Sequence, residues 1–312
     1  MRGVVKGMLT HTPSPESPVQ PVQPVRRRWL SALGLLPLLQ ACSPLRLINA
    51  IVPDGSHTLI EGRAYGADER QRLDVYLPKP AVQGAPMVVF FYGGSWSSGD
   101  RADYKFVGEA LAASGTVTVV ADYRLSPAVR YPVFLQDSAE AVKHASRNAD
   151  AWGVSPERIF LMGHSAGAYN AAMLALDPRW LPGAGVRRAQ IAGWIGLAGP
   201  YDFLPIAVPE VQEAFEWPNT PANSQPLFYA RQTDAAAPQR VLLLAAREDE
   251  VVNPQRNTVA LSRALSERGE AVQTELFARV GHATLIGAMA APLRGLAPVL
   301  ETVRQFIAKQ PS

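Results

Sequence analysis

Short apolar runs alternate with amphipathic stretches along most of the chain. Two early runs, 59–65 and 72–77, alternate apolar and polar residues on either side of the turn residues 66–68, which predicts an antiparallel strand pair. Four later runs, at 87–91, 117–121, 159–162 and 241–245, are largely apolar, as is typical of strands buried on both faces. The runs 191–197 and 272–277 are expected to add two more strands.

Helical patterns fill the gaps between these runs, at 104–113, 132–152, 166–176, 254–268 and 293–309. A repeated strand–helix order predicts an α/β fold with a mostly parallel central sheet, flanked by helices and wound with right-handed crossovers. The stretch 200–238 breaks the rhythm and is rich in proline, polar and aromatic residues. We predict that it forms a small insertion above the carboxyl-terminal edge of the sheet.

Composition narrows the class of protein. The 312 residues are 47% hydrophobic and 18% charged, as expected for one large globular domain. The net charge is +3, and part of it lies in the run Arg26-Arg27-Arg28. Because no basic stripe is interleaved with aromatic residues elsewhere, we expect no nucleic-acid partner. A single cysteine, Cys42, excludes an internal disulfide and any zinc site that needs two thiolates.

The amino-terminal segment has the order of an export signal. The three arginines precede a short apolar run, 29–39, and then Gln40-Ala41-Cys42. The run is too short to span a membrane. Leu39-Gln40-Ala41-Cys42 resembles a bacterial lipobox, which implies a signal peptide over 1–41, lipid on Cys42 and a mature domain over 42–312. The protein would then be exported, anchored in the cell envelope and facing the periplasm. An ordinary secretory peptide with an incidental cysteine is the alternative.

One motif carries candidate catalytic chemistry. Gly163-x-Ser165-x-Gly167 follows an apolar strand run and precedes an alanine-rich helical run. This context is that of the nucleophile elbow, in which a serine lies on a strained strand-to-helix turn. The flanking glycines are needed because side chains there would collide with neighbouring backbone. His164, beside the serine, is expected to pack beneath the turn.

A serine hydroxyl needs a base to accept its proton and a carboxylate to orient that base. In α/β-hydrolases, which carry such an elbow, the chain order of the catalytic residues is serine, acid, histidine. His282 is the one histidine after Ser165. The loop after the run 241–245 offers three adjacent carboxylates. Asp249 is favoured because Asp-x-Val-Val-x-Pro resembles the acid loop of α/β-hydrolases, and Glu248 and Glu250 remain alternatives.

The segment Tyr92-Gly93-Gly94-Ser95-Trp96 ends a strand run, where backbone N–H groups can meet a developing oxyanion. It resembles the His-Gly-Gly-Gly-Trp loop of the carboxylesterase, hormone-sensitive-lipase-like and feruloyl-esterase branch of α/β-hydrolases. Asp122-Tyr123-Arg124 resembles that branch's Asp-Tyr-Arg segment. The similarity runs from about residue 73 to the last helix, and isoprenylcysteine methylesterases and kynurenine-formamidase-like proteins are near relatives.

The resemblance implies oxyanion donors at the N–H groups of Gly94, Ser95 and Ala166, with Gly93 as a less favoured fourth. Tyr92 stands where the family has histidine and Ser95 where it has glycine. Tyr92 and Trp96 are expected to bind substrate, and the Tyr92 phenol is a candidate for holding the loop in shape. Asp122, Arg124 and Asp137 are expected to brace loops. The candidates for aromatic side chains that line the substrate pocket are Trp96, Tyr123, Phe203 and Trp217.

Together these features predict a serine hydrolase that cleaves a small-molecule ester with a short acyl group through Ser165, His282 and Asp249. No metal or organic cofactor is implied, and the oligomeric state is left open. An amidase or formamidase with the same triad is one alternative. A non-catalytic envelope lipoprotein with a hydrolase fold is the other.

Overall fold

The computed structural model describes residues 48–49, 52–53, 55–232 and 239–309. All of them belong to one compact unit, Cys42–Ser312. The expected signal peptide over 1–41 and Cys42 lie outside the described residues. The domain boundary at Cys42, the lipid anchor and the location in the envelope therefore stay predictions.

One eight-stranded sheet organises the described residues, in the order β1-β2-β4-β3-β5-β6-β7-β8. The predicted antiparallel pair is confirmed as β1 against β2, and β2 also pairs antiparallel with β4. All pairs from β4 through β3 to β8 are parallel. The strands are β1 (His57–Ala64), β2 (Arg72–Pro78), β3 (Ala85–Phe91), β4 (Val117–Ala121), β5 (Val154–His164), β6 (Ile191–Leu197), β7 (Arg240–Ala246) and β8 (Ala271–Phe277).

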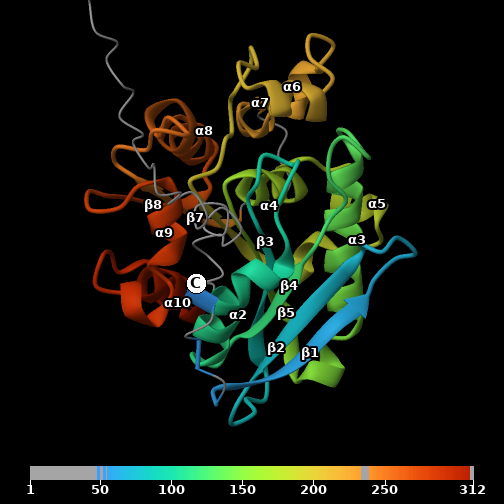
Figure 1. Cartoon of the computed structure of the whole chain (residues 1–312), viewed down its shortest axis with the longest axis vertical. Helices are drawn as coiled ribbons and strands as arrows, with labels where there is room; N and C mark the ends of the chain where they lie inside the picture. The colour runs from blue at the N-terminus through green and yellow to red at the C-terminus, as the bar shows by residue number, and fades with distance from the viewer. Residues whose placement is uncertain (1–47, 50–51, 54, 233–238, 310–312) are drawn as a thin grey trace, which may run out of the picture. The chain divides into compact units, whose positions relative to one another are not determined.

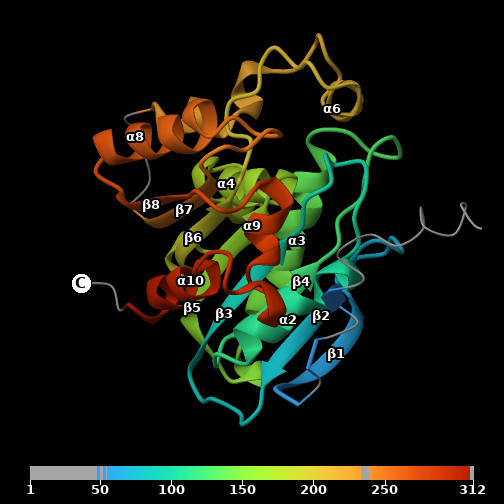
Figure 2. The ribbon, with the colours of Figure 1, turned by 60° about the vertical axis from the view of Figure 1, so that its left-hand side comes forward.

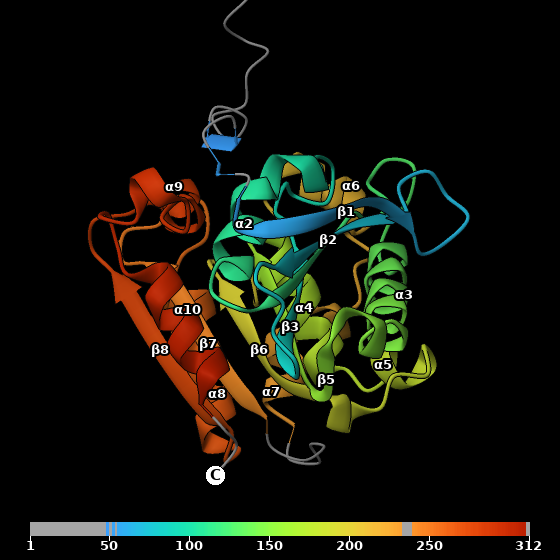
Figure 3. The same cartoon turned by 90° about the horizontal axis from the view of Figure 1, so that it is seen from below.

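Burial follows the sequence pattern. The continuous apolar runs of β3 and β4 are buried at nearly every position, whereas β1 alternates and is largely exposed. The sheet twists strongly, so that its outermost strands β1 and β8 cross at a large angle (Figure 3).

Helices cover both faces of the sheet. On one face α2 (Lys105–Ala112) contacts α10 (Val299–Ala308), and both lie in front of the strands in Figure 2. On the other face a chain of contacts links a second group of helices, some of them only one turn long. These are α3 (Val133–Arg147), α4 (Ala166–Leu176), α5 (Trp180–Gly183), α7 (Pro226–Ala230) and α8 (Ala260–Glu267).

Three predicted helices are shorter than expected. The helix expected over 132–152 ends at Arg147, where the Asn148 side chain donates to the His144 carbonyl, and a separate 3-10 turn, Asp150–Trp152, follows and ends at Gly153 with a left-handed φ of 72°. The one expected over 254–268 opens with a π-helical turn, Gln255–Val259. The last one starts only at Val299, after Pro298.

The described part of the insertion, 200–232, lies above the ends of the parallel strands, as expected (Figure 1). Its described residues form α6 (Pro209–Ala214), a short 3-10 turn (Ala222–Ser224) and α7. Two of its aromatic rings, Phe203 and Phe215, pack on Trp96 with centroid distances of 5.8 and 4.7 Å. The insertion is therefore joined by aromatic packing to the loop that follows β3.

Candidate active site

Ser165 lies on a tight turn between β5 and α4, as the motif predicts. Its backbone is at φ 54° and ψ −124°, a strained conformation for a residue with a side chain. A Cβ at Gly163 would collide with the Gly167 carbonyl, and one at Gly167 would collide with the Phe91 carbonyl at the end of β3. The two glycines thus let the turn close and hold the serine side chain above the sheet edge.

Three predicted side chains meet at this edge. Ser165 Oγ lies 2.9 Å from His282 Nε2, and His282 Nδ1 lies 2.8 Å from Asp249 Oδ2. An ionised carboxylate can only accept, so Nδ1 carries the proton and Nε2 accepts from the serine hydroxyl. This chain of hydrogen bonds can pass the hydroxyl proton to His282 and turn Ser165 into a nucleophile.

Asp249 differs from its neighbours in burial. Its carboxylate is fully buried, and Oδ1 accepts from the backbone N–H groups of Val251 and Val252, both at 2.9 Å. Burial raises the pKa of Asp249, but the hydrogen bonds from His282 and these two amides outweigh it and leave that pKa below its ordinary value. Glu248 and Glu250 are exposed, so the structure brings only Asp249 to the histidine.

His282 is the first residue of a short helix, α9 (His282–Gly287), which follows the loop after β8. The Thr284 hydroxyl accepts a hydrogen bond from the Gly281 N–H at 2.8 Å. This bond caps the helix at Gly281, the residue before the histidine.

His164 packs beneath His282, as expected. Its Nε2–H donates to the His282 carbonyl at 3.0 Å, and the two rings lie 4.9 Å apart between centroids. Burial, with the nearby His282 charge, lowers the pKa of His164 to about 3. His164 is therefore a neutral support that holds the backbone of the triad histidine.

The predicted oxyanion donors lie in the turns that follow β3 and β5. Ser95 and Ala166 line the same cavity as Ser165. Among the described residues, the backbone N–H groups of Gly94, Ser95 and Ala166 have no hydrogen-bond acceptor, so they are free to meet a ligand oxygen. Gly93 serves a steric purpose instead, because a Cβ there would lie 2.8 Å from the Ser165 Cβ.

Tyr92 faces away from this cavity. Its side chain is fully buried; its hydroxyl donates to Asp122 at 2.8 Å and accepts from Arg70 at 2.7 Å. The expectation that Tyr92 binds substrate was wrong, because its phenol points beneath the loop into this polar network. The expectation that the phenol holds the loop in shape is confirmed. The phenol ties the start of the loop to Asp122, whose carboxylate also forms an ion pair with Arg101.

A second ion pair, between half-buried Arg124 and buried Asp137, braces the same region. Arg124 donates to both carboxylate oxygens of Asp137, at 2.7 and 2.9 Å. This confirms the expected structural role of Arg124 and Asp137.

The cavity at the serine has a volume of about 320 Å³. Trp96 and Phe203 line it, but Tyr123 and Trp217 do not. The Trp96 indole N–H donates to Asn170 at 3.0 Å, so its ring presents an apolar wall. Most of the opposite wall comes from apolar side chains of the insertion and the acid loop: Pro200, Phe203, Pro205, Ile206, Ala207, Val208, Val211, Val251 and Val252.

Within the described ranges, no three or more His, Cys, Asp or Glu side chains are placed to hold a metal ion. No helix there has the length and apolar character needed to cross a membrane.

Comparison with known proteins supports this architecture. The profile of the BD-FAE family matches residues 73–265. A probable isoprenylcysteine alpha-carbonyl methylesterase of Oryza sativa subsp. japonica is 29% identical over 56% of this chain and 44% of its own length. The kynurenine formamidase of Danio rerio is 25% identical over 71% of this chain and 74% of its own. The chain thus spans less than half the length of the curated methylesterases it matches.

The fold has close counterparts among solved structures. An inhibited esterase B from Lactobacillus rhamnosis superposes with a TM-score of 0.71 at 19% identity, covering 86% of this chain and 93% of that one. At this identity the likeness shows the fold alone, and that fold is the predicted α/β-hydrolase fold.

Proposed function

The chain belongs to the BD-FAE family, and from that premise we propose that it is a serine hydrolase that cleaves carboxylic esters. The observation that carries the proposal is the unbroken line of hydrogen bonds from Ser165 through His282 to Asp249. A buried, ionised aspartate, a histidine in the right tautomer and a serine on a strained turn are the parts of an acyl-transfer site.

The reaction would proceed in two steps. His282 Nε2 takes the Ser165 proton as Oγ attacks the ester carbonyl, and the resulting imidazolium then gives that proton to the departing alcohol oxygen. Water, deprotonated by the same nitrogen, next attacks the acyl-serine ester, and the carboxylic acid leaves as Ser165 regains its proton. Asp249 keeps the ring oriented and stabilises the imidazolium.

The oxygen that becomes negative in each step needs donors already in place. The N–H groups of Gly94, Ser95 and Ala166 are candidates because they have no acceptor among the described residues, and Ser95 and Ala166 line the cavity at Ser165. Loss of one such donor in a serine hydrolase costs about 3–4 kcal/mol of transition-state stabilisation.

The cavity favours compact, apolar substrate groups. Its volume of about 320 Å³ lies near the lower end of the roughly 300–1,000 Å³ typical of small-molecule sites. Its far wall is largely hydrophobic, so a short acyl chain or a small aryl group fits it better than a charged one.

A substrate panel tests this function. Purified protein would be assayed with acetyl, butyryl, feruloyl and methyl esters, with Ser165→Ala as the matched control. We expect turnover of at least one short-chain ester by the native chain and none by the variant. Hydrolysis that persists in Ser165→Ala, or no turnover of any ester by folded protein, would contradict the proposal.

A formamidase is the second candidate, and the coverage of the Danio rerio kynurenine formamidase favours it, since that match spans most of both chains. The same triad can cleave a formamide, because only the leaving group changes. N-formylkynurenine in the panel separates the two candidates: a larger kcat/KM for it than for every ester assigns the chain to the amide class.

We also propose that the protein is exported and held in a bacterial envelope by lipid on Cys42. The position of the chain's single cysteine, directly after a charged and then an apolar run, supports this. Several acyl chains, at about 0.8 kcal/mol for each buried methylene, would hold it on a membrane. Metabolic labelling with a palmitate analogue should mark the native chain and not Cys42→Ser; equal labelling of both would contradict the anchor.

A further inference from the structure

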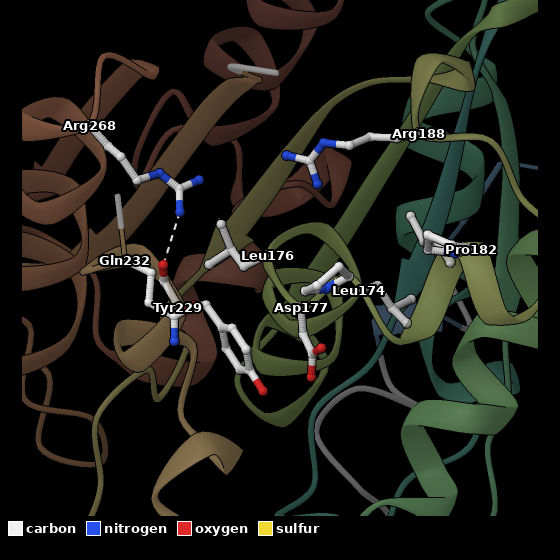
Figure 4. A pocket seen from close by; sticks show the side chains of 10 residues that line it. Leu174, Leu176, Asp177, Pro182, Arg188, Tyr229, Gln232 and Arg268 are labelled. Carbon is white, nitrogen blue, oxygen red and sulfur yellow. Dashed lines mark hydrogen bonds between the residues drawn. The ribbon is translucent and has the colours of Figure 1, made fainter. Parts of the chain in front are cut away.

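A second cavity lies away from the serine, between the end of α4, α5 and α7. Its volume is about 160 Å³, so it suits a ligand smaller than the drug-sized molecules that fill pockets of roughly 300–1,000 Å³. Leu174, Leu176 and Leu181 give it an apolar surface, and two arginines, Arg188 and Arg268, face it. Figure 4 shows the two guanidinium groups pointing toward each other from opposite sides, above Leu176.

Arg268 is an incompletely bonded, buried cation. Its side chain is only 8% exposed. It donates to the Tyr229 carbonyl at 2.9 Å and to Glu270 at 2.6 Å. Its buried Nε has no partner among the described residues. A guanidinium has five N–H donors, so several remain available on the cavity side.

Within the described chain, the Arg188 guanidinium has even fewer hydrogen-bond and ion-pair partners than that of Arg268. It donates to the Ala175 carbonyl near the end of α4, and no carboxylate of the described chain lies within ion-pair distance of it. Its Nε is also buried without a partner. Burial lowers the pKa of Arg188, and the positive charge of Arg268 acts in the same direction against the attraction of Glu270. The cavity therefore holds a cation in need of an anion.

Among the described residues, the carboxylates near the cavity are already engaged. Asp177 is bonded by the Arg179 guanidinium at 2.6 Å, and Glu270 by Arg268. In this described part of the chain, three arginines (179, 188 and 268) against two carboxylates (177 and 270) leave one positive charge over. That excess charge belongs to Arg188.

We propose that this cavity binds a small carboxylate with a short apolar tail. The carboxylate would accept from the free N–H groups of Arg188 and Arg268, in the planar fork geometry that guanidinium groups offer. The tail would lie on the leucine side chains at the end of α4, which an inorganic anion would leave uncovered. The site thus selects for a carboxylate over phosphate or sulfate.

The cavity is distinct from the site at Ser165. Ala166, at the start of α4, lines the first cavity, and Leu174 and Leu176, at the end of that helix, line the second. An eleven-residue helix is about 16 Å long, so one ligand cannot reach both. The inference does not depend on the proposed esterase function.

Calorimetric titration of the full chain with butyrate, and separately with inorganic phosphate, tests the proposal. We expect one saturable butyrate site, phosphate binding at least about tenfold weaker, and a loss of butyrate affinity of at least about tenfold in Arg188→Gln. Arg187→Gln is the matched control, because Arg187 is exposed and lies outside the cavity lining; it should bind as the native chain does. Absent saturation, unchanged affinity in Arg188→Gln, or phosphate binding as tight as butyrate would each overturn the proposal.

A second measurement covers the case in which Arg188→Gln does not fold. Methyl NMR of the native chain should show the Leu174 and Leu176 signals shifting saturably with butyrate while those of Val208 and Val251 stay in place. Shifts confined to the two valines would locate the ligand at Ser165 instead and overturn the proposal.

Discussion

The two walls of the cavity at Ser165 are built on different principles. One wall consists of Ser95, Trp96, Ser165 and Ala166, which follow buried strands of the sheet. The other consists of the insertion and the acid loop, where Val208 and Val251 remain 48% and 70% exposed. Ser165, Ser95 and Ala166 therefore follow strands of the core, whereas most side chains that would contact the rest of a substrate lie in the insertion.

The supports of the two walls differ in the same way. Beneath the first, Tyr92 and Asp122 form a buried polar network with Arg70 and Arg101. The second is held by aromatic packing of Phe203 and Phe215 on Trp96 and by the Asn257 side-chain oxygen, which accepts from the backbone N–H groups of Tyr201 and Asp202. We therefore expect changes on the first wall to be costly and changes to the apolar side chains of the second wall to tune selectivity.

The largest contrast is expected within the acid loop itself. Asp249→Asn should lower kcat by about 10⁴, as loss of the acid does in other triads, because the histidine loses its orienting acceptor. Glu248→Gln and Glu250→Gln, one position away but exposed, should leave kcat within about twofold. Steady-state kinetics on the best ester measures all three; comparable losses from either glutamate variant would contradict the choice of Asp249.

Tyr92→Phe tests the buried network. It removes a hydroxyl that donates to Asp122 and accepts from Arg70, so both lose a partner. The free energy of unfolding should fall by about 1–3 kcal/mol, and kcat should fall more than KM rises as the loop loosens.

Tyr131→Phe is the matched control for Tyr92→Phe. Among the described residues, the Tyr131 hydroxyl is hydrogen-bonded to the exposed Arg179 alone. Urea unfolding should place this variant within about 0.5 kcal/mol of the native chain. Equal stability of the two variants would show that the Tyr92 hydroxyl does not brace the loop.

His164→Gln tests the neutral support under the base. The pKa of His164 is about 3 in the folded chain and about 6.5 when unfolded, so below pH 6.5 the unfolded state binds the extra proton. The native fold should lose up to about 1.4 kcal/mol per pH unit from this group as the pH falls toward 3. Urea unfolding at pH 7.5 and 5.0 should show a smaller loss for His164→Gln, whose amide can still donate to the His282 carbonyl; equal losses would contradict the assignment.

The smallest effect is expected at the periphery. Val208→Ser should reduce kcat/KM for a butyryl ester by about two- to tenfold and leave an acetyl ester nearly unchanged, since a half-exposed methyl contact contributes little. Val82→Ser is the control, an exposed valine that lies outside the cavity lining. A uniform loss on both esters would argue that Val208 supports the fold rather than acyl selectivity.

The sequence predicted best those features that are local or ordered along the chain. The parallel sheet followed from continuous apolar runs, and Ser165 with His282 from a motif and a chain order. Asp249 was favoured over Glu248 and Glu250 by the resemblance of Asp-x-Val-Val-x-Pro to an acid loop, not by residue type, because all three are carboxylates; in the fold, burial separates them.

Features that depend on distant partners escaped prediction. The direction of the Tyr92 phenol depends on Arg70 and Asp122, which lie 22 and 30 residues away. The insertion wall lacks a periodic pattern, so no sequence signal placed Ile206 or Val211 beside Ser165. The arginine-lined cavity joins residues 80 positions apart (268 − 188), and each looks ordinary in its own segment.

Active-site labelling tests the central claim most directly. A fluorophosphonate probe followed by peptide mass spectrometry should place one adduct on Ser165 in the folded chain, and labelling should fall to background in His282→Ala with the fold retained by circular dichroism. No adduct on Ser165, as expected of a non-catalytic lipoprotein, or equal labelling without His282, would show that these hydrogen bonds do not activate the serine.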